Sequence, residues 1–212
     1  MPLLNLRHVL RPGVLLRSAQ PTGLTPEEAA HLGGFLRLVV DLRSERECSP
    51  GDWALLDVPV KRMGGKGAPS DLYRLPDDLT LGALYVTMLE HQAAWFAEVI
   101  VEIAGNLPAL VHCAAGKDRT GIVVALILDL VGADEETIVR DYALTQKDLP
   151  RILEMLEVPG IPHALLDAPE EAMRTFLAEL AARGGARAVL APHGLTPAHV
   201  ELLRAGLLTA VG

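Results

Sequence analysis

The chain has 212 residues, half of them hydrophobic, and carries a formal net charge of −8. This length suits a single domain that buries its own core without a disulfide or a structural metal ion, and the acidic balance disfavours a nucleic-acid-binding protein. Only two cysteines are present, which excludes a disulfide framework and leaves a cysteine nucleophile as the alternative.

The N-terminal segment lacks the long apolar stretch of a secretory signal peptide. The longest uninterrupted apolar stretch, residues 122–128, is far shorter than the roughly 20 residues that cross a bilayer. We therefore expect a cytoplasmic protein without a transmembrane segment, and secretion without a cleaved signal stays open as the alternative.

The first sixty residues alternate between strand and helix patterns. Short apolar runs predict three strands, the first of them at a sheet edge: residues 14–18, 36–42 and 53–60. Between the first two, Thr25 and Glu28 form a capping box, and Pro26 suits the first position of a helix.

Residues 61–80 show no periodic pattern and are rich in glycine and proline, so they predict a loop or lid inserted into the domain. Thr80 then caps a long predicted helix that runs to Ala104 and stops at Gly105. Residues 108–112 (PALVH) predict a fourth strand. The helix that follows is apolar on nearly every side, which is typical of a buried, central helix.

The C-terminal part, about residues 146–212, is predicted to be helical. Helix patterns after the buried helix cover residues 133–146, 169–182 and 197–208. Strands separated by helices predict one α/β domain over residues 1–212, with a central, mainly parallel sheet of roughly four or five strands flanked by helices. Ligands of such folds bind beyond the carboxyl ends of the strands, where Asp41, Arg43 and the loop at residues 112–120 are expected to meet.

That loop follows a strand and precedes a helix, so Cys113 is expected near a helix N-terminus, where a negative charge is favoured. We therefore expect a thiolate at neutral pH. The short residues Ala114, Ala115 and Gly116 allow successive backbone N–H groups to face one point and bind an oxyanion. The guanidinium of Arg119 can hold two phosphate oxygens at once. A thiolate in such a site can attack phosphorus and form a phosphocysteine.

Other residues around the loop have supporting roles or none. Thr120 can hydrogen-bond the sulfur and help it leave in the second step. His112 is predicted to hydrogen-bond the loop rather than act as a base. Asp41 and Arg43 either hold the loop in shape or form a surface pair. Cys48 is either inert or the partner of the nucleophile in a reversible disulfide.

The stretch HCAAGKDRTG at residues 112–121 resembles the Cys-x5-Arg signature of the protein tyrosine phosphatase superfamily. With LLRSAQ and DLRSERE upstream and DYALT downstream, the chain resembles the bacterial atypical tyrosine phosphatases, most densely over residues 14–145. The resemblance implies a tyrosine-phosphatase-like fold and activity on phosphotyrosine, sometimes extending to phosphoserine, phosphothreonine and phosphoinositides.

The chain departs from the large eukaryotic tyrosine phosphatases in one respect, since it has no Trp-Pro-Asp sequence to supply a general acid. An alkoxide or phenoxide leaves poorly without a proton, so another acid is needed. Asp118 is the first candidate, as in myotubularin-type lipid phosphatases, and a purely structural carboxylate is the alternative. Asp71, Asp77 and Asp78 on the lid are the other candidates. Lys117 adds a second cation, and its resemblance to a lysine of lipid phosphatases, which suits multiply phosphorylated head groups, makes phosphoinositide activity an expectation.

The predicted function is a metal-independent phosphomonoesterase that acts through a phosphocysteine, foremost a protein tyrosine phosphatase with scope for dual specificity. The alternatives are a phosphoinositide phosphatase with the same mechanism and a catalytically weak phosphate-binding adaptor. The expected partners are a phosphorylated protein or phosphoinositide and an oxyanion in the loop. No cofactor, metal ion or nucleic acid is expected.

Overall fold

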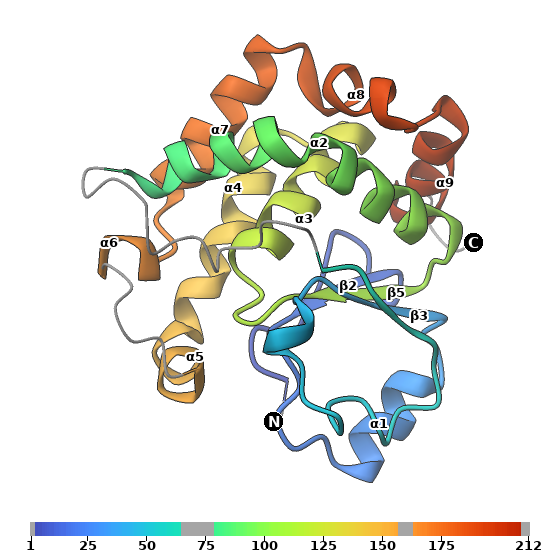
Figure 1. Ribbon diagram of the computed structural model, residues 1–212. Coiled ribbons are helices and arrows are strands. Elements are labelled where there is room, and N and C mark those ends of the chain that lie inside the picture. The colour runs from blue at the N-terminus through green and yellow to red at the C-terminus, as the bar shows by residue number, and fades with distance from the viewer. Residues whose placement is uncertain (1–2, 65–78, 157–162, 209–212) are drawn as a thin grey trace.

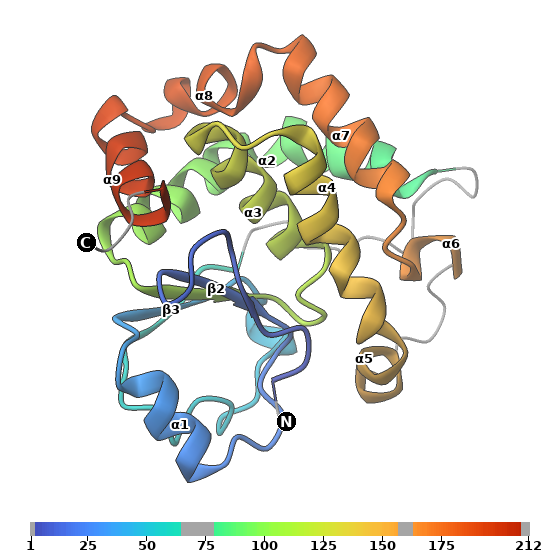
Figure 2. The same ribbon diagram turned by 180° about the vertical axis from the view of Figure 1, so that it is seen from behind.

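The computed structural model describes residues 3–64, 79–156 and 163–208, and Figures 1 and 2 show it from opposite sides. In these residues a five-stranded sheet has the order β1-β2-β5-β3-β4. The strands are β1 (Arg7–His8), β2 (Leu15–Ser18), β3 (Leu38–Asp41), β4 (Val60–Arg62) and β5 (Ala109–His112). Strand β1 is antiparallel to β2 and every other neighbouring pair is parallel, which confirms the predicted mainly parallel sheet.

The two faces of the sheet are covered unequally. On one face lies helix α1 (Pro26–Gly33), in a cluster with the strand residues Leu16 and Val39. The residues beside them along each strand point to the other face, because successive side chains of a strand alternate. Helices α2 (Leu81–Gly105) and α3 (Asp118–Val131) cover that second face (Figure 1).

Four of the remaining helices, α4 (Glu135–Ala143), α7 (Glu170–Ala182), α8 (Gly185–Leu190) and α9 (Pro197–Leu208), lie on the α2–α3 side of the sheet (Figure 2). Helix α5 (Leu149–Leu156) lies beside the sheet, away from α2 (Figure 2). The other helical segments are α6 (His163–Leu166) and short turns of 3-10 helix at η1 (Glu45–Glu47), η3 (Leu144–Lys147) and η4 (Ala191–His193). One hydrophobic cluster joins the sheet to α2, α3 and α7 through α9, so the chain forms a single α/β domain.

The strand predicted over residues 53–60 is wrong in position. Residues 50–55 form turns, and strand β4 begins only at Val60. Trp53, Leu56 and Val58 are buried in the α1 cluster, so the run is apolar because it fills a core through turns. A short apolar run looks the same in either case.

Strand β2 is also not at the sheet edge, because the two-residue strand β1 pairs outside it. The predicted helix starts are confirmed. The Thr25 hydroxyl accepts from the Glu28 amide, and the Thr80 hydroxyl accepts from the Ala83 amide. Helix α2 has one non-helical residue, Gln92, that the sequence pattern did not indicate.

Most of the predicted lid at residues 61–80 lies outside the described residues, and so do Asp71, Asp77 and Asp78. The lid and its three carboxylates stay predictions. Within the described ranges, no helix has both the length and the apolar character that crossing a membrane requires.

Candidate active site

Cys113 directly follows β5, the central strand, and residues 113–117 lead from it to the first turn of α3. The register of the sheet places His112 beside Ser18 of β2 and beside Asp41 of β3. The carboxyl ends of three parallel strands therefore meet at this loop, as the strand order of an α/β fold predicts for a ligand site. The Cys113 side chain is buried, with 2% of its surface exposed.

The carbonyl groups of residues 113–116 are all hydrogen-bonded to groups outside the loop. The donors, named here the loop collar, are His112 Nδ1 (3.1 Å), the Gln20 amide (2.9 Å), Asn5 Nδ2 (3.3 and 3.0 Å) and Arg17 Nη2 (2.7 Å). A trans peptide unit directs its N–H opposite to its C=O, so the amides of residues 114–117 point away from the collar. No acceptor for these amides lies within the described residues. A row of free amides is an oxyanion site.

Gly116 is the residue in this loop whose identity is dictated by space. Its φ is +65°, and a Cβ there would lie 2.2 Å from the Ser18 carbonyl oxygen. Only glycine combines that backbone angle with so close an approach to β2. Of the short residues predicted for the loop, Gly116 is thus needed for the contact with the sheet.

Arg119, 5% exposed, is held by one edge of its guanidinium. Nη1 donates to the Leu42 carbonyl and to Glu47 Oε2, each at 2.9 Å, and Nη2 donates to Glu47 Oε1 at 2.5 Å. Three of the five N–H groups of an arginine are then used, and the two that remain lie on the Nε–Nη2 edge. Two parallel donors match two oxygens of a phosphate.

Glu47 is itself fixed, because the amide and hydroxyl of Ser44 both donate to its Oε2 at 2.8 Å. Burial alone would lower the pKa of Arg119, but the Glu47 hydrogen bonds and the nearby Cys113 charge raise it above its ordinary value. Burial would raise the pKa of Glu47, and Arg119 instead holds it below its ordinary value. The guanidinium therefore stays charged and in place.

Asp41 and Arg43 form a buried pair, and not the surface pair that was the alternative. Arg43 Nε and Nη2 donate to the two Asp41 oxygens at 2.9 and 2.7 Å, with side chains at most 1% exposed. Burial opposes the charge of Asp41, but the Arg43 hydrogen bonds and the nearby His112 hold its pKa below the ordinary value. Arg43 Nη1 also donates to Gln20 Oε1 at 3.1 Å, which connects the pair to the loop collar.

His112 is fully buried, and Trp53 Nε1 donates to its Nε2 at 3.2 Å. Because Nε2 accepts, the hydrogen of the neutral ring is on Nδ1, which donates to the Cys113 carbonyl. Burial lowers the pKa of His112 to about 4. A neutral ring with both nitrogens engaged fits the predicted role of a residue that holds the loop.

Asp118, with 26% of its side chain exposed, is the first residue of α3. Its Oδ1 accepts from the Tyr85 hydroxyl at 2.7 Å and lies 3.3 Å from Lys117 Nζ. Lys117 is buried, and its Nζ also donates to the carbonyls of Leu165 at 2.6 Å and Asp167 at 2.9 Å. The ammonium thus joins the loop to α6 and to the residue that follows it, and its part in substrate binding stays a prediction.

Thr120 Oγ1 is buried and has no hydrogen-bond partner within the described residues, so its hydroxyl is free for a group at the loop. The other cysteine is placed differently. The Cys48 thiol donates to Asp41 Oδ2 at 3.7 Å and lies 3.4 Å from the Ser44 carbonyl. Burial and the Asp41 charge raise the pKa of Cys48, which keeps it a thiol.

Residues at the site that the sequence did not indicate include Asn5, Arg17, Glu47 and Tyr85. Arg17 is fully buried and pairs with Asp141 at 2.5 Å while it donates to the loop. Arg17 and Glu47 lie in LLRSAQ and DLRSERE, so the family resemblance contained a signal for them. Asn5 and Tyr85 lie in segments without any such pattern.

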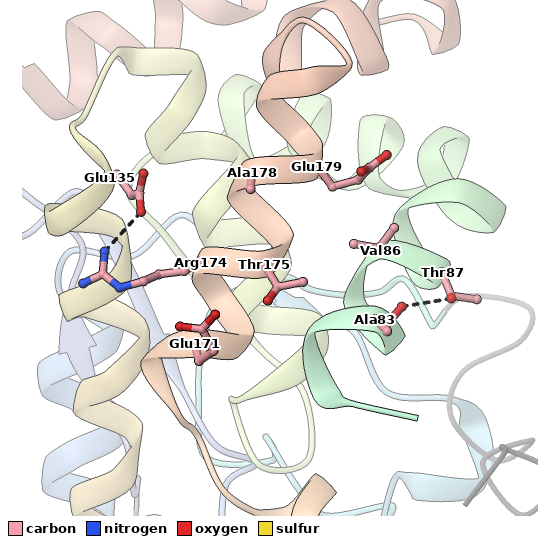
Figure 3. Close-up of a pocket in the computed structure, with 9 residues that line it drawn as sticks. All are labelled: Ala83, Val86, Thr87, Glu135, Glu171, Arg174, Thr175, Ala178 and Glu179. Atoms are coloured by element: carbon pink, nitrogen blue, oxygen red, sulfur yellow. Dashed lines mark hydrogen bonds and ion pairs between the residues drawn. The ribbon is translucent and has the colours of Figure 1, made fainter. Parts of the chain in front are cut away.

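A pocket of about 790 Å³ lies elsewhere, between α2, α4 and α7 (Figure 3). Carboxylates and one arginine, Arg174, line part of it, and none of the loop residues does. No cluster of His, Cys, Asp and Glu side chains in the described part of the chain could hold a metal ion. We therefore take the residues around Cys113 as the candidate active site.

Comparisons with known proteins bear on the family and the fold. The chain is 48% identical over 135 residues to the triple specificity protein phosphatase PtpB of Mycobacterium tuberculosis, covering 62% of this chain and 43% of that protein. It is 44% identical over 68 residues to a tyrosine-protein phosphatase of Nostoc commune, covering 31% of this chain and 23% of that protein. The chain thus spans less than half the length of these two relatives.

A solved structure shares the fold. The core catalytic domain of the PP-IP phosphatase SIW14 from S. cerevisiae, in complex with citrate, matches with a TM-score of 0.50 and 16% identity over 87% of this chain and 94% of that one. The family model described as the tyrosine phosphatase family matches residues 2–209. Because this match covers nearly the whole sequence, the chain belongs to the tyrosine phosphatase family.

Proposed function

We propose that the chain is a metal-independent phosphomonoesterase that acts through a phosphocysteine, with phosphotyrosine as its preferred substrate. The observation that supports this most is the position of Cys113, which follows β5 and opens the row of amides at residues 114–117. The free edge of Arg119 adds two donors to that row. Amides and a guanidinium together stabilise the charge on the oxygens of a transferring phosphoryl group.

In the first step, the Cys113 thiolate attacks phosphorus, and the bond from phosphorus to the ester oxygen breaks. The ester oxygen leaves with the electrons of that bond and takes a proton from Asp118. The nearby helix N-terminus of α3 favours the thiolate before attack. Asp118 suits the role of acid because it is partly exposed and lies five residues beyond the nucleophile, at the start of α3.

In the second step, water attacks phosphorus, the S–P bond breaks, and inorganic phosphate leaves. Asp118, now a carboxylate, takes the proton of the attacking water. The Thr120 hydroxyl, which is buried and unpartnered within the described residues, can donate to the departing sulfur. The lid aspartates remain the alternative acids, because a closing loop can bring a carboxylate to the leaving oxygen.

Substrate breadth is the second part of the proposal. The relative from Mycobacterium tuberculosis is called a triple specificity phosphatase, which favours activity beyond phosphotyrosine. Lys117 would be the cation for a multiply phosphorylated head group, but two backbone carbonyls already bind its amine. This engagement favours a phosphoprotein over a phosphoinositide as the main substrate.

The test is a substrate panel of phosphotyrosine peptide, phosphoserine peptide and phosphoinositide, measured by phosphate release. Cys113→Ser should abolish turnover of all three and still bind the phosphotyrosine peptide. Cys48→Ser is the matched control, with the same substitution at the other cysteine, and should turn over like wild type. EDTA should have no effect, and vanadate should inhibit competitively. Turnover retained in Cys113→Ser would exclude the mechanism, and loss of activity in EDTA would point to a metal-dependent enzyme.

A further inference from the structure

We infer that Tyr85 is a positioning residue for Asp118, and that it commits Oδ2 of this carboxyl group to donating the proton to the leaving group. This inference rests on the proposed function, in which Asp118 is the general acid. It assigns a role to a residue of the long helix α2 that lies far from the signature loop in sequence.

The contact itself is short and partly buried. The Tyr85 side chain is fully buried, and its hydroxyl donates to Asp118 Oδ1 at 2.7 Å. The hydroxyl of Tyr142, on α4, lies 2.7 Å from the Tyr85 hydroxyl. A phenol has one hydrogen to give, and Tyr85 gives it to the carboxylate, so Tyr142 must donate to Tyr85. The three groups form one directed chain from α4 through α2 to α3.

Packing leaves this chain little freedom. The rings of Tyr85 and Tyr142 meet edge to face with centroids 5.9 Å apart. On α3, Gly121 makes room for the second ring, because a Cβ there would lie 3.1 Å from Tyr142 Cδ2. Tightly packed rings do not change rotamer readily, so the hydroxyl of Tyr85 is held at a constant place beside the carboxyl group.

The two oxygens of Asp118 are then unequal. Oδ1 receives the Tyr85 hydroxyl and lies 3.3 Å from the ammonium of Lys117. Oδ2 has no partner within the described residues. A hydrogen placed on Oδ1 would face two donors, whereas a hydrogen on Oδ2 faces none. The proton for the leaving oxygen is therefore held on Oδ2.

Tyr85 also keeps its own hydrogen throughout. Burial, together with the charge of Asp118, raises the pKa of Tyr85 well above its ordinary value. The same causes, burial first, raise the pKa of Tyr142. Neither phenol is a reservoir of protons for the reaction. Their contribution is orientation, which matters because a small misplacement of a catalytic group is costly in rate.

The experiment compares Tyr85→Phe with Tyr142→Phe. Each variant removes one buried hydroxyl, but only the first touches Asp118. Both are assayed with an alkyl phosphate, a poor leaving group, and with para-nitrophenyl phosphate, a good one. Tyr85→Phe should lower kcat about tenfold on the poor leaving group and less than about twofold on the good one, with KM unchanged. Tyr142→Phe should show the same pattern, with a smaller fall in kcat on the poor leaving group.

A second background separates orientation from general damage to the loop. In Asp118→Asn, which has no proton to give, adding Tyr85→Phe should cause no further loss on the poor leaving group. Vanadate affinity should be the same in all these variants, since the amides and Arg119 are untouched. An equal loss on both substrates, or a further loss in the Asp118→Asn background, would overturn the positioning role.

A spectroscopic readout avoids reliance on either phenylalanine variant. The chain has three tyrosines, so uniform 3-fluorotyrosine labelling yields few ¹⁹F signals. At least two of them should move in Asp118→Asn, and a spectrum without any change would contradict the contact. Failure of the inference differs from failure of the proposed function. If only the inference fails, wild type is active and Cys113→Ser is inactive, but Tyr85→Phe lowers kcat equally on both substrates or not at all. If the proposed function fails, Cys113→Ser stays active.

Discussion

Two arginines of this chain each bind several carboxylates, but in opposite surroundings. Arg43 lies beside the candidate active-site loop with 2% of its surface exposed, and it pairs with Asp41 and Asp52. Arg174 lies in the pocket between α2, α4 and α7, where Figure 3 shows it reaching toward Glu135. Comparing them shows how differently a buried ion pair and an exposed ion pair fix an arginine and stabilise the fold.

Arg43 has every donor satisfied. Its Nε–H and four Nη–H groups meet, in turn, Asp41 twice, Asp52, Gln20 Oε1 and the Glu47 carbonyl. A buried charge is tolerated only when it is paired and fully hydrogen-bonded, so this region has one arrangement. Gln20 connects this region to the loop, because its side chain accepts from Arg43 and its amide donates to the Ala114 carbonyl.

Arg174 makes four hydrogen bonds to carboxylates, but these partners are exposed to water. Its side chain is 31% exposed, and those of Glu135, Glu136 and Glu170 are 58% to 67% exposed. Exposed pairs gain little, because water and salt screen the charges. The exposed pairs in the α2–α4–α7 pocket therefore hold their arginine loosely, and the buried pair beside the Cys113 loop holds its arginine in place, which makes the Cys113 region the stronger candidate for function.

Breaking the buried pair should have the largest effect. Arg43→Met keeps much of the side-chain volume but leaves Asp41 buried without its partner. We expect a loss of about 3–5 kcal/mol in the free energy of unfolding, measured with urea. Arg174→Met, the same change at the surface pair, should move the unfolding midpoint far less. Equal shifts in the two variants would show that burial does not separate these regions.

The pH dependence of stability should sharpen the comparison next. His112 has a folded pKa of about 4, below its ordinary 6.5. As the pH falls from about 6.5 to 4, the unfolded chain takes up a proton that the folded chain refuses. The stabilisation is therefore complete above pH 6.5 and lost toward pH 4, by about 3 kcal/mol in total.

The measurement is the free energy of unfolding as a function of pH. His112→Gln keeps a donor and an acceptor but does not titrate, so its curve should be flatter than that of wild type in this window. His193→Gln, at an exposed histidine of η4, is the control and should follow wild type. A wild-type slope that survives in His112→Gln would assign the proton uptake to another group.

Two glycines test whether the loop is as crowded as the buried pair beside it. Gly116 and Gly23 have almost the same φ, +65° and +66°, but a Cβ meets the Ser18 backbone at the first and nothing within 4 Å at the second. Alanine should cost about 1 kcal/mol at Gly23, from the backbone angle alone. At Gly116 the clash adds to that, for a total of roughly 2–3 kcal/mol. Phosphatase activity should fall only in Gly116→Ala. Equal losses of stability in the two variants would mean that the loop backbone shifts and relieves the clash with Ser18.

How far the sequence could predict this site follows from where its residues lie along the chain. Residues 113–119 are contiguous, so spacing and residue type alone indicated a nucleophile, a row of backbone amides for an oxyanion, and a guanidinium. The collar is assembled from distant segments, and Asn5 reaches a carbonyl 110 residues away. No local pattern shows such a partner, because a long-range hydrogen bond leaves no period in the sequence.

The fold, too, has parts that the sequence predicted and parts that it did not. Strands β3 and β5 are buried on both faces and appeared as continuous apolar runs. The turns around Trp53 were mistaken for a strand because apolar residues fill a core equally well from irregular backbone. The buried state of Asp41 and Arg43 was left undecided, since burial of a charge depends on partners that only the fold brings together.

The smallest expected effect is at the surface pair itself. Arg174→Met should lower the urea midpoint slightly at low ionic strength, and the difference from wild type should vanish near 1 M salt, where charges are screened beyond about 3 Å. Arg43→Met should keep most of its deficit in the same salt, because ions do not reach a buried pair. Activity on phosphotyrosine should be unchanged in Arg174→Met, since the pocket of Figure 3 contains none of the loop residues. A clear loss of turnover in Arg174→Met would mean that the α2–α4–α7 pocket takes part in substrate recognition.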